Sequence, residues 1–358
     1  MEEKLIAACE SGKVEEVQQF LNNPNINPNY QNNFNETPFF LACYYAQMEV
    51  VKLLLADSRV EVNKENNNGA TAFYIACREG NIEIVKELAK DKRVDINNSN
   101  DDTHSPLWIS CQNNHVEVVK LLLKDERVNQ INTPGNIVGE MPIHVACREG
   151  NFEILKVLVN DDRVEINSKM NNGSTPLYIS CYHGRKDIVK LLLTLEKIDV
   201  NKDDHDGVTP FHAACLRGHP EIVKLLLQDK RVDINKTDHA GATPFITASY
   251  LGHLEVIQYI IVSGRKVDLA AKDGDGKSEI DNAKDEGHLQ LVELLESFDN
   301  NQEETTIQLR KQLGLSSKKL LKYSCHFNFI FNFCFLKKKK NLKINLIKDL
   351  DFPEVQKD

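Results

Sequence analysis

Several features that would indicate particular classes of protein are missing from this 358-residue sequence. It has no run of about 18 apolar residues, which excludes a conventional membrane-spanning helix. Met1-Glu2-Glu3-Lys4 does not open a secretory signal peptide, so we expect an intracellular protein, in the cytoplasm first and the nucleus as the alternative. Without an export signal, the nine cysteines are expected to be reduced thiols rather than a disulfide framework.

Motifs for catalysis and metal binding are missing as well. No Cys-x-x-Cys pair, no Gly-rich phosphate loop and no recurring set of nucleophile, base and acid occurs in the sequence. The sequence therefore predicts a non-enzymatic protein with no cofactor, no metal and no small-molecule substrate, although it leaves open a catalytic site assembled from distant segments. The net charge of -9 argues against a nucleic-acid-binding surface over the whole molecule.

What is present is a short anchor, usually Thr-Pro, that recurs along the chain. The seven anchors are spaced by 34, 34, 36, 34, 34 and 34 residues, and they begin at Thr37, Thr71, Ser105, Met141, Thr175, Thr209 and Thr243. Two less regular copies flank them, near Glu3 and Ser278. We therefore divide residues 1–299 into nine units, which start near residues 3, 37, 71, 105, 141, 175, 209, 243 and 278.

Each unit carries the same local signals. A hydroxyl residue followed by proline starts a first helix, and a glycine nine residues after the anchor ends it, with Ala46 and Asn114 as exceptions. A second, strongly apolar helix follows, then a short extended piece and a polar turn that closes on glycine. Thr103 takes the place of that glycine in one unit and predicts a distorted turn there.

The copy from Gly207 to His219, which reads GVTPFHAACLRGH, resembles the ankyrin repeat. The resemblance covers roughly residues 1–299 and implies an all-α solenoid of about nine helix-turn-helix units with β-turn or hairpin loops. It also implies a monomeric interaction scaffold that binds a protein partner. The histidine of the family's motif is kept as His144 and His212, whereas most other units have an aromatic residue or isoleucine there, which predicts aromatic packing in its place.

The repeat assigns most reactive side chains to structural positions. One cysteine column lies directly after a small residue on the first helix and comprises Cys9, Cys43, Cys77, Cys111, Cys147, Cys181 and Cys215. We predict that these thiols are buried and separate, because neighbouring units stack at the helix-packing distance of about 10 Å. Most histidines also fall in repeat columns, four of them directly after the helix stop.

The resemblance implies that a partner lies along a concave face, made by the turn tips and the exposed ends of the first helices. Ala70, Glu140 and Ser174 belong to the columns that form this face, and tyrosines in these columns are candidate anchors. The 36-residue unit places its extra residues in segment 129–140. The residues that we predict to bind a partner are Phe34, Glu36, Tyr44, Tyr45, Arg78, Glu79, Asp101, Asp102, Gln112, Asn113, Ile137, Val138, Arg148, Glu149, Tyr182, His183, His205, Asp206, Leu216, Arg217, Tyr250 and Leu251.

The repeat stops at residue 300, and the charge changes sign. Residues 301–358 hold 12 Lys and Arg against 6 Asp and Glu, so this part carries +6 and, because the whole chain carries -9, residues 1–300 carry -15. Residues 303–314 predict a short helix with acids near its start and bases near its end, able to dock on the last unit. The rest of this basic tail, which spans residues 300–358, is expected to be disordered.

Residues 322–340 leave three interpretations open. Phe327–Leu336, acylation of Cys325 or Cys334 and the cluster Lys337–Lys340 together predict a peripheral membrane anchor. The four lysines alone are typical of a nuclear-import or nucleic-acid patch. The composition is also that of a translated A/T-rich non-coding stretch, and the sequence favours disorder or this last origin. The alternative function is therefore a membrane-tethered adaptor or a regulatory subunit of an enzyme complex.

Overall fold

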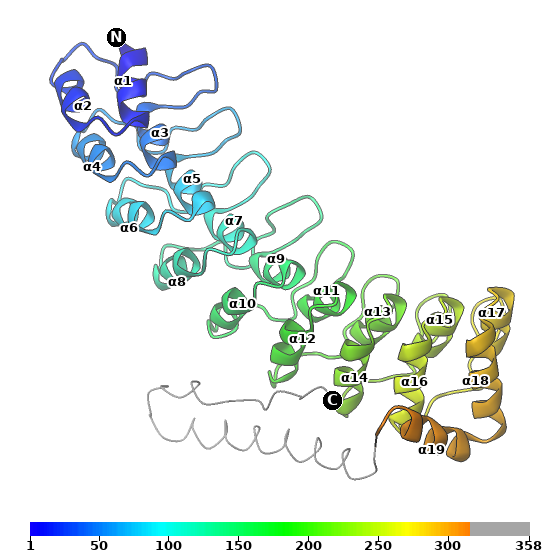
Figure 1. The fold of residues 1–358 in the computed structure, drawn as a ribbon. Coiled ribbons are helices and arrows are strands. Elements are labelled where there is room, and N and C mark those ends of the chain that lie inside the picture. Colours follow the sequence, from blue (N-terminus) through cyan, green and yellow to red (C-terminus); the bar gives the residue numbers. More distant parts are fainter. Residues whose placement is uncertain (316–358) are drawn as a thin grey trace, which may run out of the picture.

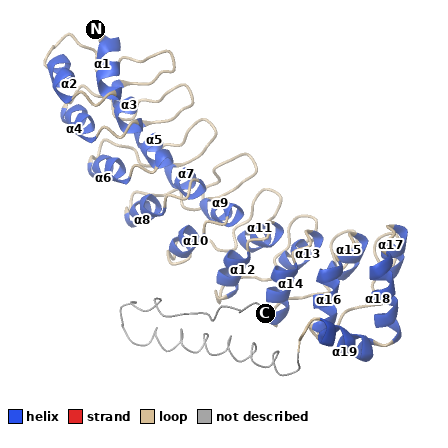
Figure 2. Cartoon of the chain, viewed as in Figure 1, coloured by secondary structure: helices blue, strands red, loops and turns tan. Residues whose placement is uncertain are grey.

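The computed structural model describes residues 1–315, and these residues form helices and loops without a strand (Figure 2). Eighteen of the helices lie as antiparallel pairs stacked in a curved row, with the loops on its concave side (Figure 1). The first helices of the pairs are α1 (Glu2–Glu10), α3 (Pro38–Tyr44), α5 (Ala72–Glu79), α7 (Pro106–Gln112), α9 (Pro142–Glu149), α11 (Pro176–Tyr182), α13 (Pro210–Leu216), α15 (Pro244–Tyr250) and α17 (Glu279–Asp285). The second helices are α2 (Val14–Leu21), α4 (Met48–Ala56), α6 (Ile82–Lys90), α8 (Val116–Lys124), α10 (Phe152–Leu158), α12 (Lys186–Leu193), α14 (Pro220–Gln228), α16 (Leu254–Val262) and α18 (Leu289–Asn300).

The predicted helix starts are confirmed in the structure. In seven units a Thr or Ser hydroxyl accepts a hydrogen bond from the backbone N–H three residues later, as Thr37 does from Phe40 at 3.1 Å. Met141 has no hydroxyl, and its own backbone N–H donates instead to Nδ1 of His144 at 3.2 Å. That bond leaves Nε2 of His144 to donate to the carbonyl of Ser168 at 3.1 Å, so the ring links the first helix to the loop that ends the same unit.

Helix ends and turns depend on residues with positive φ. Gly80 and Gly150 end α5 and α9 with φ of +73° and +82°, and Ala46 and Asn114 adopt +56° and +60° at the equivalent places. The predicted distortion at Thr103 is wrong. Its φ is +68° and its N–H donates to Asn100 at 2.9 Å, the same turn that glycine makes elsewhere, so the backbone conformation is kept at the cost of a strained threonine.

The core is one continuous apolar cluster along the row, between first and second helices. In the pair α13–α14, Phe211, Cys215, Val223 and Leu226 are all 1% exposed or less. All seven cysteines of the predicted column are free and buried, which confirms their structural position. Burial raises the pKa of Cys9 and Cys147 to about 12 and that of the other five thiols still further, so they are protonated at neutral pH.

Arginines join most second helices to the next unit, although Lys197 replaces the arginine that would reach α10. The guanidinium of Arg93 donates to the carbonyl of Leu55 at 2.6 Å, and that of Arg127 to Ala89 at 2.6 Å. Each of these arginines is also held by an aspartate two residues earlier, as Arg93 is by Asp91. The same contact recurs at Arg59, Arg163 and Arg231. The last carbonyls of the second helices are thereby satisfied by the following unit.

Helix α19 (Gln302–Gln312) follows the pairs and closes the row. It packs against α16 and α18, which confirms the predicted docking of a short helix near residues 303–314 and extends it to a second neighbour (Figure 1). Leu309 is buried, Thr305 Oγ1 donates to the carbonyl of Ser297 at 2.8 Å, and Arg310 donates to the carbonyl of Val262 at 2.8 and 3.1 Å. Arg310 thus gives α16 the contact that other second helices receive from the next unit.

Within residues 1–315, no helix combines the length and the apolar character that a membrane crossing requires. The proposed anchor segment 322–340, with Cys325, Cys334 and Lys337–Lys340, lies outside the described residues. Its role therefore stays a prediction.

Candidate partner-binding face

The turn tips that form the candidate face are joined to one another by backbone hydrogen bonds. The N–H of Asn67 donates to the carbonyl of Phe34 at 3.0 Å, and the N–H of His205 donates to that of Asn172 at 2.9 Å. The same bond joins further neighbouring tips at Asp101, Asn171, His239 and Gly274. One place in the described row is different, because no such bond joins Asp102 to Ile137, where the extra residues of segment 129–140 lie. The tips therefore form a row with a single interruption.

A second set of bonds fixes the ends of the first helices. His219 Nε2 lies 3.1 Å from the carbonyl of Tyr182, and His253 and His288 make the same contact with Leu216 and Tyr250 at 3.2 and 3.0 Å. Polar side chains in the same column do so in the other units, at Gln47, Asn81, His115, Asn151 and Arg185. The histidines after the helix stop are therefore structural, because they hold the preceding helix end in place.

None of the 22 residues predicted for the face is buried, and most are exposed. Large apolar side chains that are open to solvent are concentrated there: of the ten such residues in the described chain, seven belong to the prediction, namely Phe34, Tyr44, Tyr45, Ile137, Val138, Tyr250 and Leu251. Ile137 is the most exposed, at 93%, and it lies in the inserted segment. The face thus offers apolar contact area that the rest of the described surface largely lacks.

Three residues of the same columns do not lie on the surface. Ala70, Glu140 and Ser174 are 4%, 2% and 0% exposed, so their expected place on the face is wrong. Glu140 is buried because its carboxylate is fully paired. Arg148 Nε and Nη2 donate to its two oxygens at 2.7 and 3.1 Å, and Asn136 Nδ2 donates to Oε2 at 2.9 Å.

The predicted tyrosine anchors fall into two classes. Tyr44 and Tyr45 are exposed, with ring centroids 4.8 Å apart in an edge-to-face arrangement. Tyr182 is half-buried and stacks on Tyr178 at 6.1 Å, while Arg217 lies 4.7 Å above its ring. Tyr182 is therefore a platform for other side chains of the face rather than a free anchor.

Trp108 shows how an aromatic residue replaces the motif histidine. Its Nε1–H donates to the carbonyl of Glu140 at 2.8 Å, and the ring of His104 stacks on it at 4.2 Å. A Cβ at Gly135 would collide with the indole of Trp108, so the inserted segment passes directly over that ring. This confirms aromatic packing at Trp108, which also makes a hydrogen bond to the end of its own unit.

The sequence analysis missed an asparagine column on the extended segments. Asn63 Nδ2 donates to the carbonyl of Arg93 at 2.6 Å, and its Oδ1 accepts from the N–H of Asp95 at 2.8 Å. The same two bonds recur at Asn29, Asn97, Asn132, Asn167, Asn201 and Asn235. An asparagine at constant spacing before each polar turn was the signal that could have found it.

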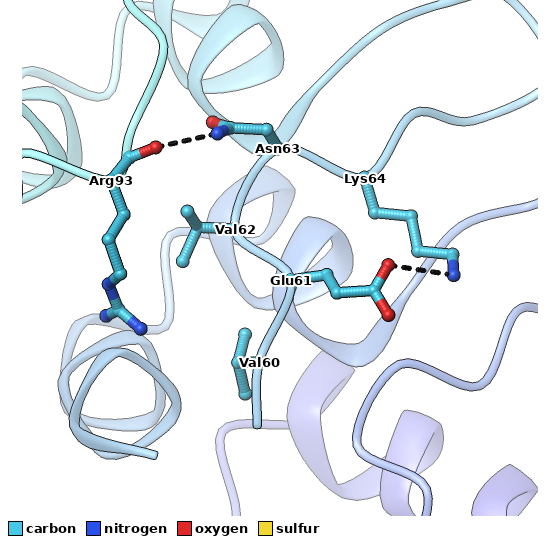
Figure 3. Close-up of a pocket in the computed structure, with 6 residues that line it drawn as sticks. All are labelled: Val60, Glu61, Val62, Asn63, Lys64 and Arg93. Atoms are coloured by element: carbon cyan, nitrogen blue, oxygen red, sulfur yellow. Dashed lines mark hydrogen bonds and ion pairs between the residues drawn. The ribbon is translucent and has the colours of Figure 1, made fainter. Parts of the chain in front are cut away.

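A hollow beside this column does not have the chemistry of a ligand site. Val60, Glu61, Val62, Asn63, Lys64 and Arg93 line it (Figure 3). Its polar groups are already engaged, since Asn63 bonds to Arg93 and Lys64 pairs with Glu61 at 3.1 Å. In the part of the chain that the structure describes, no group of three or more His, Cys, Asp or Glu side chains could hold a metal ion.

Comparison with known proteins gives one match. A family model described as ankyrin repeats, in three copies, matches residues 5–100, 51–133, 92–170, 132–204 and 193–273. No curated protein matches the chain.

Proposed function

This chain belongs to the ankyrin repeat family, and we propose that it is a non-enzymatic scaffold of nine units that binds a protein partner along its concave face. Ankyrin repeats are generally protein–protein interaction modules and are typically non-enzymatic. The observation that carries the choice of surface is the concentration of exposed large apolar side chains at the turn tips and first-helix ends. Such exposed apolar area is typical of interaction sites.

The partner is first identified by affinity capture with mass spectrometry, and its binding to three forms of the chain is then measured. The face variant carries Tyr45→Ala, Ile137→Ala and Tyr250→Ala, all three at exposed positions. The matched control carries Leu289→Ala and Ile307→Ala, which remove exposed apolar side chains (75% and 58% exposed) outside the predicted face. Tyr182 is left intact because its replacement would disturb Tyr178 and Arg217.

We expect the face variant to bind at least about tenfold more weakly, since central aromatic and aliphatic anchors carry most of the energy of an interface. The control is expected to bind as the wild type does, and all three proteins should melt at similar temperatures. Equal binding by the face variant and the wild type would refute the proposed surface.

The alternative function, a membrane-tethered adaptor or an enzyme's regulatory subunit, is supported only by the composition of the tail. An apolar run, Phe327–Leu336, is followed directly by Lys337–Lys340, and an anchor of this kind requires both signals. Sedimentation of the full chain with vesicles containing phosphatidylserine, lost on replacement of the four lysines by glutamine, would support the tether. A protein that stays in the supernatant supports the scaffold acting in the cytoplasm.

A further inference from the structure

Two arginines in the C-terminal half of the array, Arg217 on the face and Arg185 beside it, have no carboxylate partner among the described residues. Arg217 lies with its guanidinium carbon 4.7 Å above the ring of Tyr182, and Arg185 donates through Nε to the carbonyl of Arg148 at 2.8 Å. By contrast, Arg78 is paired with Glu79 at 2.8 Å and Arg148 is paired with Glu140 at 2.7 Å. Arg185 and Arg217 therefore keep donor groups available for another anion.

Packing holds these side chains in place. Tyr182 is stacked between Tyr178 and Arg217 and meets the ring of His183 edge-on at 5.2 Å. The aliphatic part of Arg185 crosses Gly150 so closely that a Cβ on the glycine would lie 3.2 Å from Cδ of the arginine. A guanidinium stacked on an aromatic face keeps its edge free for hydrogen bonds, and its order lowers the entropic cost of binding.

The charged groups that act on His183 are mainly positive. Partial burial lowers the pKa of His183, and the positive charges of Arg185, Arg148 and Arg217 lower it further, whereas Glu140 acts in the opposite direction. Residues 1–300 as a whole carry -15, so this is a cationic place in an acidic array. An anion is attracted to such a cationic place.

We propose that Arg217 and His183, which both contact the ring of Tyr182, form together with Arg185 a subsite for an oxyanion on the protein partner, either a side-chain carboxylate or a phosphoryl group. The subsite rests on the proposed function, since it lies on the predicted face. The guanidinium edge matches the geometry of both groups and binds either through two parallel hydrogen bonds. The neighbouring Tyr250 and Leu251 then contact an apolar residue of the same partner segment.

The first experiment needs no partner. The pKa of His183 is measured by NMR in the full chain, with its resonance assigned by the loss in His183→Gln, in chloride, glutarate or inorganic phosphate at equal ionic strength. Because a bound anion stabilises the imidazolium, glutarate or phosphate raises the pKa of His183 relative to chloride. The rise is expected to be at least halved in Arg217→Gln and in Arg185→Gln, and unchanged in Arg78→Gln, the control whose arginine is already paired.

Each outcome decides the question. A pKa of His183 that is the same in all three salts, or a rise that Arg217→Gln leaves intact, overturns the subsite. A rise with phosphate alone assigns a phosphorylated partner, and a rise with glutarate as well assigns an acidic one. With the captured partner, Arg217→Gln is expected to weaken binding about tenfold, as for the loss of one charge-assisted contact.

The two proposals fail separately. If the subsite is overturned, the face variant with Tyr45, Ile137 and Tyr250 replaced still tests the scaffold. If the face variant binds normally while anions still raise the pKa of His183, the face is wrong as a whole and the anion site remains.

Discussion

Replacing Arg310 by alanine is expected to release α19 from the end of the array. The variant loses two charge-assisted hydrogen bonds to the carbonyl of Val262, at 2.8 and 3.1 Å. Charge-assisted hydrogen bonds contribute about 1.5–3 kcal/mol each to stability. These two bonds share one acceptor and the arginine is half exposed, so the pair is expected to contribute about 1.5 kcal/mol to the docking of α19. This corresponds to about a tenfold increase in the undocked population of α19.

Hydrogen exchange followed by mass spectrometry measures this change directly. Peptides from α19 are expected to exchange about tenfold faster in Arg310→Ala, and the last turn of α16 should exchange faster as well, because its carbonyl loses its partner. Peptides from α7 and α9 should be unchanged, since each unit of a solenoid contacts only its neighbours. Lys311→Ala is the matched control, because it removes the same charge from the exposed neighbouring position.

Two results would refute this reasoning. If α19 exchanges at the wild-type rate in Arg310→Ala, the contact with Val262 does not hold the helix. If Lys311→Ala speeds exchange equally, the helix is held by charge and the helix dipole, not by the two hydrogen bonds.

Three further predictions concern the array itself. Thr103→Gly should stabilise the chain by about 1 kcal/mol in urea unfolding, because glycine adopts the observed φ of +68° without strain; an unchanged or lower stability would contradict it. In native protein at pH 8, at most Cys325 and Cys334 should react with a maleimide, because the seven column thiols are buried and burial raises their pKa. All nine cysteines should react in urea, and prompt labelling of Cys181 in the native protein would exclude the buried column. Burial lowers the pKa of His144 to about 4, below the unfolded value of about 6.5, so its stabilising contribution is complete above pH 6.5 and is lost as the pH falls toward 4, at up to about 1.4 kcal/mol per pH unit. The free energy of urea unfolding, measured between pH 5 and 7, should therefore depend less steeply on pH in His144→Gln than in the wild type. An equally steep dependence would contradict this.

The local parts of the fold could be predicted from the sequence because they depend on short-range signals. Thr37 and Pro38 determine a helix start through one hydroxyl and one fixed dihedral angle, and the cysteine column follows from the repeat period. The docking of α19 on the last unit could be predicted, but not its contact with α16. Arg310 and Val262 are 48 residues apart, and no periodicity relates them.

The candidate face was harder to predict, because column position does not determine burial. Glu140 shares its column with half-buried residues such as Glu36 and His104, yet it is buried once Arg148 and Asn136 pair with its carboxylate. Tyr182 shares a column with the exposed Tyr44, yet Arg217 covers its ring. These differences in burial arise from contacts between side chains that belong to different repeat columns. The residue type at one column position does not reveal such contacts.

The position of Arg310 also limits how the array can grow. A copied 34-residue unit placed between two existing units would bring its own arginine, asparagine and turn, and each would find an equivalent partner on both sides. The same unit added after α18 would meet α19, which already occupies the exposed side of α16. Internal duplication is therefore compatible with this structure, whereas elongation at the C-terminal end requires that α19 be displaced or lost.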